Sequence, residues 1–200
     1  MLVVGLTGPI GSGKTTFAVL LAERGAQVIE ADLLGRDAVR PGRPAWHSVV
    51  DQFGEEILAP TTMEIDRRAL AEIVFRDRTK LAALNAIVHP VIFRAIADEL
   101  EKLRGTEEIV VLDAALIIET GLDEVIDVLV VVTAPQHVRE RRLVNKRGLS
   151  LEDVRNRIAS QQRPEDLVAR ADVLVSNDGS LEDLAAEAER VWKELQGRRA

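Results

Sequence analysis

The chain has 200 residues, of which 46% are hydrophobic and 30% charged, and its formal net charge is −7. This length and apolar content suffice for one domain, or for one core with small inserted lobes. The negative charge argues against a dedicated nucleic-acid binder, which is usually basic or carries a basic face. We therefore expect small-molecule partners and no nucleic acid, and nothing in the sequence indicates an obligate protein partner.

The cysteine content and the apolar runs also indicate in which cellular compartment the protein is expected. The sequence has no cysteine, so it has no disulfides and no thiolate metal sites. It opens on an apolar run and not on the charged segment and apolar core of a signal peptide. Its long apolar stretches, such as Val125 to Ala134, are shorter than the ~20 residues that span a bilayer. We expect a cytoplasmic protein with no membrane partner.

Five short β-rich runs are predicted to form strands. Helical segments separate them, and nearly continuous apolar strands of this kind are typical of a parallel sheet covered on both faces. The predicted fold class is therefore α/β, with one five-stranded parallel sheet. A last helix is expected from about Ser180 to Leu195, with Ser180 as its cap and Asp183 three residues later. The predicted strands are 2–7, 27–31, 109–113, 128–133 and 173–176.

Two insertions interrupt this alternation. Residues 34–104 have helical periodicity and should form a helical lobe, and Pro90 should kink its second helical pattern or start a new helix there. The second insertion, 136–170, is called the basic segment here. Within it, residues 137–170 sum to +4 while the rest of the chain sums to −11. The remaining stretches form the predicted core and are 1–33, 105–135 and 171–200.

The segment GPIGSGKT, Gly8 to Thr15, matches the phosphate-loop pattern G-x-x-x-x-G-K-[ST], with a strand before it and a helix after it. The glycines let backbone N–H groups face inward as an anion nest, and the helix N-terminus adds partial positive charge. A P-loop NTPase fold is therefore predicted, with a nucleoside triphosphate as ligand. A glycine-rich turn that only connects strand and helix is the alternative.

Each polar side chain of the loop has an expected role. Lys14 reaches the β- and γ-phosphates, the Thr15 hydroxyl ligates Mg²⁺, and Thr16 contacts the α-phosphate. Lys14 is also one of the predicted catalytic residues. The predicted nucleotide-binding residues of the loop are Gly11, Ser12, Gly13, Lys14, Thr15 and Thr16.

The loop alone does not say whether water or a second substrate takes the γ-phosphoryl group. A GTPase would need a guanine-reading N-K-x-D segment, and the nearest match, NKRG from Asn145, lacks the acid. The DLLG segment that starts at Asp32 mimics the GTPase D-x-x-G but follows Lys14 by only eighteen residues. The sequence thus favours a kinase over a molecular switch.

Two further positions are candidates for catalysis. Asp32 follows the second strand, at the edge where open α/β proteins bind ligands, so it could be the base for an acceptor hydroxyl or hold Mg²⁺ through water. It could also only cap the helix that begins near Leu33. In the basic segment, Arg142 or, second, Lys146 would neutralise the transferred group as a lid closes. A solvated charged helix is the alternative there.

The chain resembles the dephospho-CoA kinase family, whose members phosphorylate the ribose 3′-hydroxyl of dephospho-CoA to make CoA. The resemblance runs almost end to end and rests on the order and spacing of its segments. These segments are GLTGPIGSGKTT, VIEAD with LLGR and RPG, DRRALAEIVF, LNAIVHP, LDAALIIETGL, GLSLEDVRNRIASQ and ARADVLVSNDGSLEDL. It implies a nucleotide-kinase-like P-loop fold with a helical acceptor-binding insertion and a helical lid, ATP and dephospho-CoA as substrates, and Mg²⁺ as cofactor. A kinase for another small alcohol or nucleotide, or a nucleotide-gated binding protein, are the alternatives.

The resemblance also assigns roles to residues of the acceptor lobe. It implies that Asp32 is the carboxylate beside the acceptor hydroxyl and that Arg36 faces the acceptor. His89 stands where the family places an acceptor-lobe histidine, although it could instead be a buried histidine at a helix start. Leu116 lies in the segment that the family places over the acceptor.

Two more assignments concern the nucleotide. The resemblance makes Arg142 the arginine of the lid. It places Asn177, in an N-x-G turn, beside the adenine of ATP, although Asn-Asp-Gly is also simply a favourable turn.

The chain departs from the family pattern at five positions. Pro9 stands where glycine is usual, Glu30 replaces an aspartate, Ala115 a proline, Arg139 a glutamine and Leu167 a lysine. The last four bear on acceptor affinity and on closure of the lid. None of the five removes a specified residue of the loop pattern, so we expect an active enzyme whose phosphate loop is stiffened by the proline.

Overall fold

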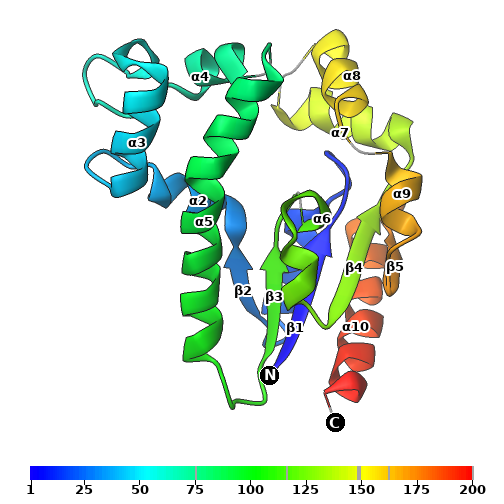
Figure 1. Cartoon of the computed structure of the whole chain (residues 1–200). Helices are drawn as coiled ribbons and strands as arrows, with labels where there is room; N and C mark the ends of the chain where they lie inside the picture. Colours follow the sequence, from blue (N-terminus) through cyan, green and yellow to red (C-terminus); the bar gives the residue numbers. More distant parts are fainter. Residues whose placement is uncertain (75, 116, 148–149, 162, 200) are drawn as a thin grey trace. The chain divides into compact units, whose positions relative to one another are not determined.

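The computed structural model describes residues 1–74, 76–115, 117–147, 150–161 and 163–199. The chain folds into two compact units (Figure 1). Met1–Glu30 and Leu103–Ala200 form the first, and Ala31–Lys102 forms the second. The positions of the two units relative to one another are not defined, so each unit is described by itself.

The first unit is built on a five-stranded parallel sheet with the strand order β2-β3-β1-β4-β5. The five predicted strands and the α/β fold class are confirmed. The three central strands are almost wholly buried, which explains why they are nearly continuous apolar runs. The strands are β1 Leu2–Thr7, β2 Gln27–Glu30, β3 Ile109–Asp113, β4 Val128–Thr133 and β5 Val173–Ser176.

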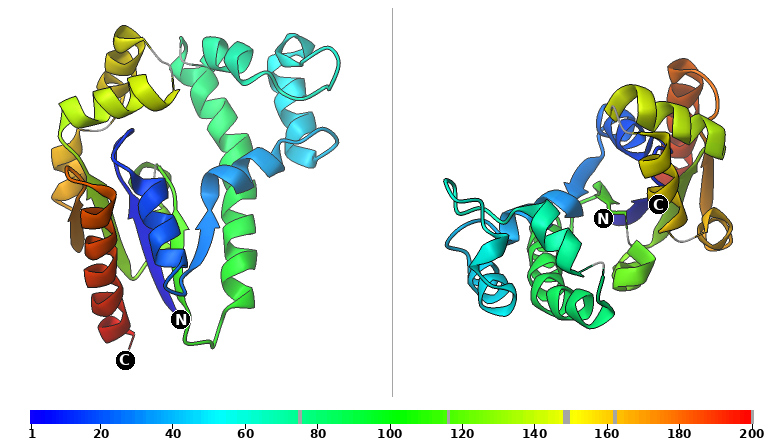
Figure 2. Two further views of the ribbon diagram at one scale, coloured as in Figure 1. Left: turned by 180° about the vertical axis from the view of Figure 1, so that it is seen from behind. Right: turned by 90° about the horizontal axis from the view of Figure 1, so that it is seen from above.

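Helices cover both faces of this sheet. Helices α1 (Lys14–Ala22) and α10 (Leu181–Arg198) pack together on one face, and α6 (Ile117–Thr120) lies on the other (Figure 2). The face under α1 and α10 holds the main core, to which Phe17, Leu21 and Val191 contribute. The remaining elements of the unit are η2 Leu122–Val125, α7 Gln136–Arg147, α8 Leu151–Ala159 and α9 Pro164–Val168.

The start of α10 has the predicted cap. The Ser180 hydroxyl accepts from the Asp183 N–H at 3.2 Å, and the Asp183 carboxylate accepts from the Ser180 N–H at 2.8 Å. This reciprocal pair is a capping box, which satisfies two backbone donors at the helix start. The pKa of Asp183 lies below its ordinary value, chiefly because its carboxylate accepts the hydrogen bond from the Ser180 N–H.

The second unit is helical. Its core contains Val49, Phe53, Ile57 and Leu70, against which the long helix α5 packs through residues such as Leu84. One helix runs through Pro90, so the alternative of a new helix at that position is wrong, and the alternative of a kink stays a prediction. Proline removes one backbone hydrogen bond of the helix, and the other hydrogen bonds of this 25-residue helix keep it continuous. The elements are α2 Ala31–Ala38, α3 Pro44–Phe53, η1 Glu55–Ile57, α4 Arg67–Val74 and α5 Arg78–Lys102.

Helix α5 (Arg78–Lys102) is also the one described helix that is long and apolar enough, by length and composition, to cross a membrane. Its most apolar 18-residue stretch has a mean hydropathy of 1.4. A single helix of this kind is weak evidence for a membrane span, because core helices pass the same test. Here α5 contributes side chains to the core of the second unit.

Candidate active site

The phosphate loop joins β1 to α1 at the carboxyl edge of the sheet. Gly11 and Gly13 have φ angles of 80° and 96°, a backbone conformation that favours glycine. Gly13 is the N-cap of α1, so the loop leads directly into the helix N-terminus, where free N–H groups and the helix dipole favour an anion. The Ser12 N–H donates to the Pro9 carbonyl at 3.0 Å and closes a turn in the loop.

The Ser12 side chain fits a loop that holds a ligand. Its hydroxyl is buried, with the residue only 1% exposed, and has no hydrogen-bond partner among the described residues. Leaving a buried polar group without a partner costs about 1–3 kcal/mol, so such groups in folded proteins need an explanation. A phosphate oxygen bound in the loop would supply the missing acceptor.

Lys14, the lysine of the loop, is paired with Asp113 at the end of β3. Its Nζ donates to Asp113 Oδ1, and the carboxylate is 5% exposed. The sheet register explains the pairing, since Asp113 stands opposite Leu6 at the end of β1. No sequence pattern predicts a role for Asp113, although a carboxylate that ends a buried apolar strand is a usable signal. The pair keeps the ammonium group at the loop and compensates a buried carboxylate.

On its other side, the loop is held by two of the predicted residues. Asn177, which directly follows β5, donates from Nδ2 to the Ser12 carbonyl at 2.7 Å. Arg142 of α7 donates to the Asn177 carbonyl at 3.0 Å and to Asn177 Oδ1 at 3.1 Å. Its Nη1 also lies 3.4 Å from the Ser12 carbonyl. The structure therefore brings Arg142 and Asn177 together at the backbone of the phosphate loop.

Two positions that depart from the family pattern are buried in this unit. Arg139 of α7 is 4% exposed, its Nε donates to the Ala134 carbonyl at 3.1 Å, and burial lowers the pKa of its guanidinium. A side chain at Gly11 would meet the Arg139 backbone at 3.1 Å, so α7 packs closely on the loop. Leu167 is buried in α9, which packs against β4, so it occupies a core position.

Two residues named from the sequence cannot be placed. Leu116 lies outside the described residues. The side chain of Lys146 also lies outside them, although its backbone belongs to α7.

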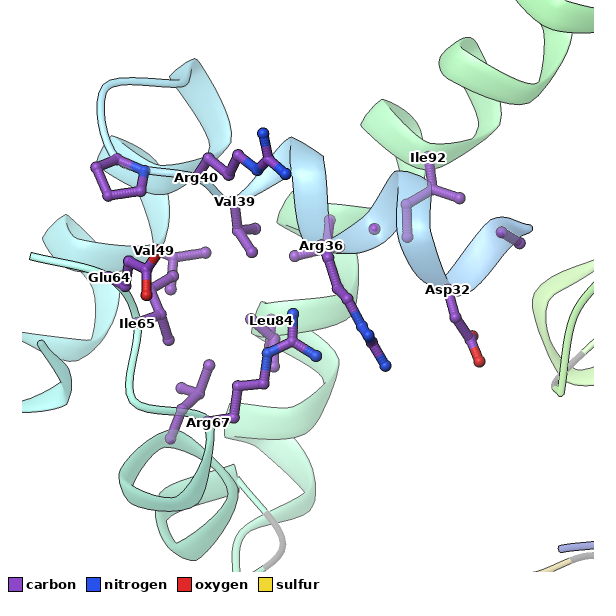
Figure 3. A pocket seen from close by; sticks show the side chains of 15 residues that line it. Asp32, Arg36, Val39, Arg40, Val49, Glu64, Ile65, Arg67, Leu84 and Ile92 are labelled. Carbon is purple, nitrogen blue, oxygen red and sulfur yellow. The ribbon is translucent and has the colours of Figure 1, made fainter. Parts of the chain in front are cut away.

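The second unit contains a cavity of about 460 Å³. Arg36, Arg40 and Arg67 line it, and Figure 3 shows the side chains of Arg36 and Arg67 reaching toward the same space. The apolar part of the lining comes from Val39, Val49, Ile65, Leu70, Leu84, Val88 and Ile92. Arginine binds phosphate and carboxylate groups through paired N–H donors, and apolar walls bury hydrocarbon. The cavity thus suits a ligand that carries both anionic groups and an apolar portion.

Two predicted acceptor residues line this cavity and a third does not. Asp32 and Arg36 belong to the lining, with Asp32 at its edge in Figure 3. Helix α2 begins at Ala31, so Asp32 lies in its first turn and not at the cap position. His89 is not part of the lining, and its ring lies 5.8 Å from that of Phe93 on the same helix. The roles of these residues stay predictions.

The parallel sheet, with a phosphate loop after its middle strand, defines a P-loop nucleotide-binding protein. The sequence model of the family "Dephospho-CoA kinase" matches residues 2–183. A dephospho-CoA kinase of Thermobifida fusca is 45% identical over 199 residues, which cover 99% of this chain and 98% of that protein. The chain therefore belongs to the dephospho-CoA kinase family.

Two solved structures are similar to this chain over nearly its whole length. A crystal structure from Thermus thermophilus is 36% identical, with a TM-score of 0.85 over 97% of both chains. The structure of a dephospho-CoA kinase from Campylobacter jejuni is 25% identical, with a TM-score of 0.74, and the match covers 99% of this chain and 98% of that one.

Replacement of Gly13 by alanine should weaken nucleotide binding. A Cβ at this position would lie 2.0 Å from Asn177 Nδ2, so the loop or the asparagine has to move. We expect the Kd for ATP to rise at least about tenfold, which corresponds to about 1.4 kcal/mol. Titration calorimetry measures this directly.

Gly105→Ala is the matched control for this prediction. Gly105 has a similar φ of 78°, but a Cβ there would meet nothing within 4 Å. Alanine at position 105 therefore has an unfavourable positive φ, like alanine at position 13, but its Cβ does not clash with a neighbouring side chain. Equal ATP affinity for both variants would contradict the proposed constraint at Gly13.

Proposed function

We propose that this protein transfers the γ-phosphoryl group of ATP to the ribose 3′-hydroxyl of dephospho-CoA, giving CoA and ADP. The observation that carries the proposal is the phosphate loop, with Lys14 held at its mouth by Asp113, in a chain of the dephospho-CoA kinase family. Shared family membership supports ATP as donor and dephospho-CoA as acceptor.

The donor site would work through the loop and Lys14. Backbone N–H groups bind the phosphates, and Lys14 adds a positive charge beside the β- and γ-phosphates. The described residues contain no group of three or more His, Cys, Asp or Glu side chains that could hold a metal ion. Kinases hold Mg²⁺ with few protein ligands plus phosphate oxygens and water, so the Thr15 hydroxyl would suffice here as a protein ligand. The ion would neutralise charge that develops on the transferred group.

The acceptor would bind in the cavity of the second unit. Dephospho-CoA carries a diphosphate and a long, mostly uncharged pantetheine arm. Arg36, Arg40 and Arg67 suit the diphosphate, while the apolar walls suit the arm. Asp32 at the edge of the cavity would accept the proton of the attacking hydroxyl.

A panel of acceptors tests this function. The protein is incubated with ATP and Mg²⁺ together with dephospho-CoA, adenosine, shikimate or gluconate, and ADP and the phosphorylated products are quantified. We expect ADP release that depends on dephospho-CoA and yields CoA. Another acceptor as the clear winner would point to a different small-molecule kinase. Turnover that no acceptor changes would point to a nucleotide-gated binding protein.

Asp32→Asn should lower turnover much more than it lowers acceptor affinity. The amide keeps the size of the side chain but cannot take a proton, and general-base catalysis is typically worth about 10²–10⁴-fold. Steady-state kinetics should show kcat falling by at least about 10²-fold, with KM for dephospho-CoA changed by less than about threefold. Near-normal kcat would rule out the role of base.

Arg67→Ala should raise KM for dephospho-CoA. A hydrogen bond to a charged group contributes about 1.5–3 kcal/mol, so an increase of at least about tenfold is expected, with a smaller effect on the KM for ATP. Arg68→Ala is the matched control, because Arg68 does not line the cavity and instead lies 3.5 Å from Glu72 on its own helix. If the two variants raise the acceptor KM equally, the cavity is not the site of the diphosphate.

A further inference from the structure

Gln161, which lies between α8 and α9 in the basic segment, contacts the phosphate loop. The backbone N–H of Ile10 donates to Gln161 Oε1 at 2.8 Å, although the two residues are 151 positions apart in sequence. A backbone N–H can only donate, so the atom facing it is the carboxamide oxygen and the orientation of the amide is fixed. The Nε2 group then keeps two donors, and no described residue accepts from it.

This contact changes which loop N–H groups are available to a nucleotide. Pro9 has no N–H, the Ile10 N–H goes to Gln161, and the Ser12 N–H goes to the Pro9 carbonyl. The N–H groups of Gly11 and Gly13 have no acceptor among the described residues. Of the backbone N–H groups from position 9 to position 13, those of Gly11 and Gly13 are therefore the ones left for a phosphate.

The contact also anchors the basic segment. Its first helix, α7, packs its backbone at Arg139 against Gly11. Gln161 ties the end of its second helix, α8, to Ile10, the residue just before. Neighbouring residues of the loop are thus held from two points of the segment.

We propose that Gln161 is a positioning residue for phosphoryl transfer, acting through the phosphate loop. The proposal rests on the proposed kinase function. Gln161 holds the Ile10 N–H in place and keeps the end of α8 on the loop, with its Nε2 donors available to a phosphate oxygen. Without this contact the Ile10 N–H is free and the end of α8 is no longer held on the phosphate loop. Water can then reach the γ-phosphate more easily and competes with the acceptor hydroxyl for the phosphoryl group.

Gln161→Ala should therefore uncouple the enzyme. We expect kcat for CoA formation to fall at least about tenfold, because small misplacements of reacting groups carry large rate costs. The fraction of ATP hydrolysed without CoA formation should rise, while KM for dephospho-CoA and the melting temperature stay near their original values. The measurements are ADP and CoA produced per unit time, together with thermal unfolding.

Gln136→Ala is the matched control. Gln136 lies in the same basic segment, is exposed, and bonds to Glu140 of its own helix at 3.0 Å. Its removal should change neither turnover nor coupling. A Gln161→Ala enzyme that makes CoA at the original rate with full coupling, as Gln136→Ala should, would overturn the proposal.

Gln161→Glu separates the two parts of the role. The carboxylate can still accept from the Ile10 N–H, but it loses the Nε2 donors and places negative charge near the phosphates. We expect this variant to keep the loop contact and still lose turnover and ATP affinity. Original turnover in Gln161→Glu would show that the Nε2 donors are not used and would overturn that part of the proposal.

Hydrogen exchange of the Ile10 amide, measured by NMR without acceptor, tests the contact independently of CoA formation. Exchange should be faster in Gln161→Ala than in the original protein, in Gln136→Ala and in Gln161→Glu. Unchanged exchange in Gln161→Ala would overturn the proposal. If the Ile10 amide of the original protein is protected but the protein makes no CoA, the proposed kinase function is wrong. The contact between Gln161 and Ile10 is then still confirmed.

Discussion

The candidate donor site depends on the hydrogen bond from Asn177 Nδ2 to the Ser12 carbonyl. This bond draws the turn after β5 onto the phosphate loop, and it requires glycine at position 13, where any Cβ would collide with the same amide. The Asn177 N–H is itself held by the Thr133 carbonyl at the end of β4, at 2.8 Å. The loop conformation is therefore fixed by the sheet and not by the loop sequence alone.

The strand order explains why the loop is held from two sides. Strand β1 lies between β3 and β4, and β5 follows β4. From the β3 side, Asp113 holds Lys14, and from the side of β4 and β5, Asn177 holds Ser12. Arg142 and Gln161 add contacts from the basic segment. Because these contacts already order the loop, little conformational entropy is lost when a nucleotide binds to its N–H donors.

Much of the fold could be predicted because buried parallel strands are apolar runs and the phosphate loop has a fixed pattern. The cap at Ser180 was equally readable, since capping depends on residues three positions apart. The ion pair of Lys14 with Asp113 could not be predicted from the sequence, because it depends on β3 lying beside β1. In the segment that contains Arg67 and Arg68, the sequence does not say which arginine lines the cavity. The Gln161 contact spans most of the chain and leaves no local pattern.

The most direct test of the account follows the fate of the γ-phosphate. The protein is mixed with ATP labelled at the γ-phosphorus, in the presence and absence of dephospho-CoA, and the label in CoA and in inorganic phosphate is counted. We predict that with dephospho-CoA nearly all released label is found in CoA, in step with ADP, and that without it little ATP is consumed. Label that goes to inorganic phosphate at the same rate in both mixtures would contradict the account.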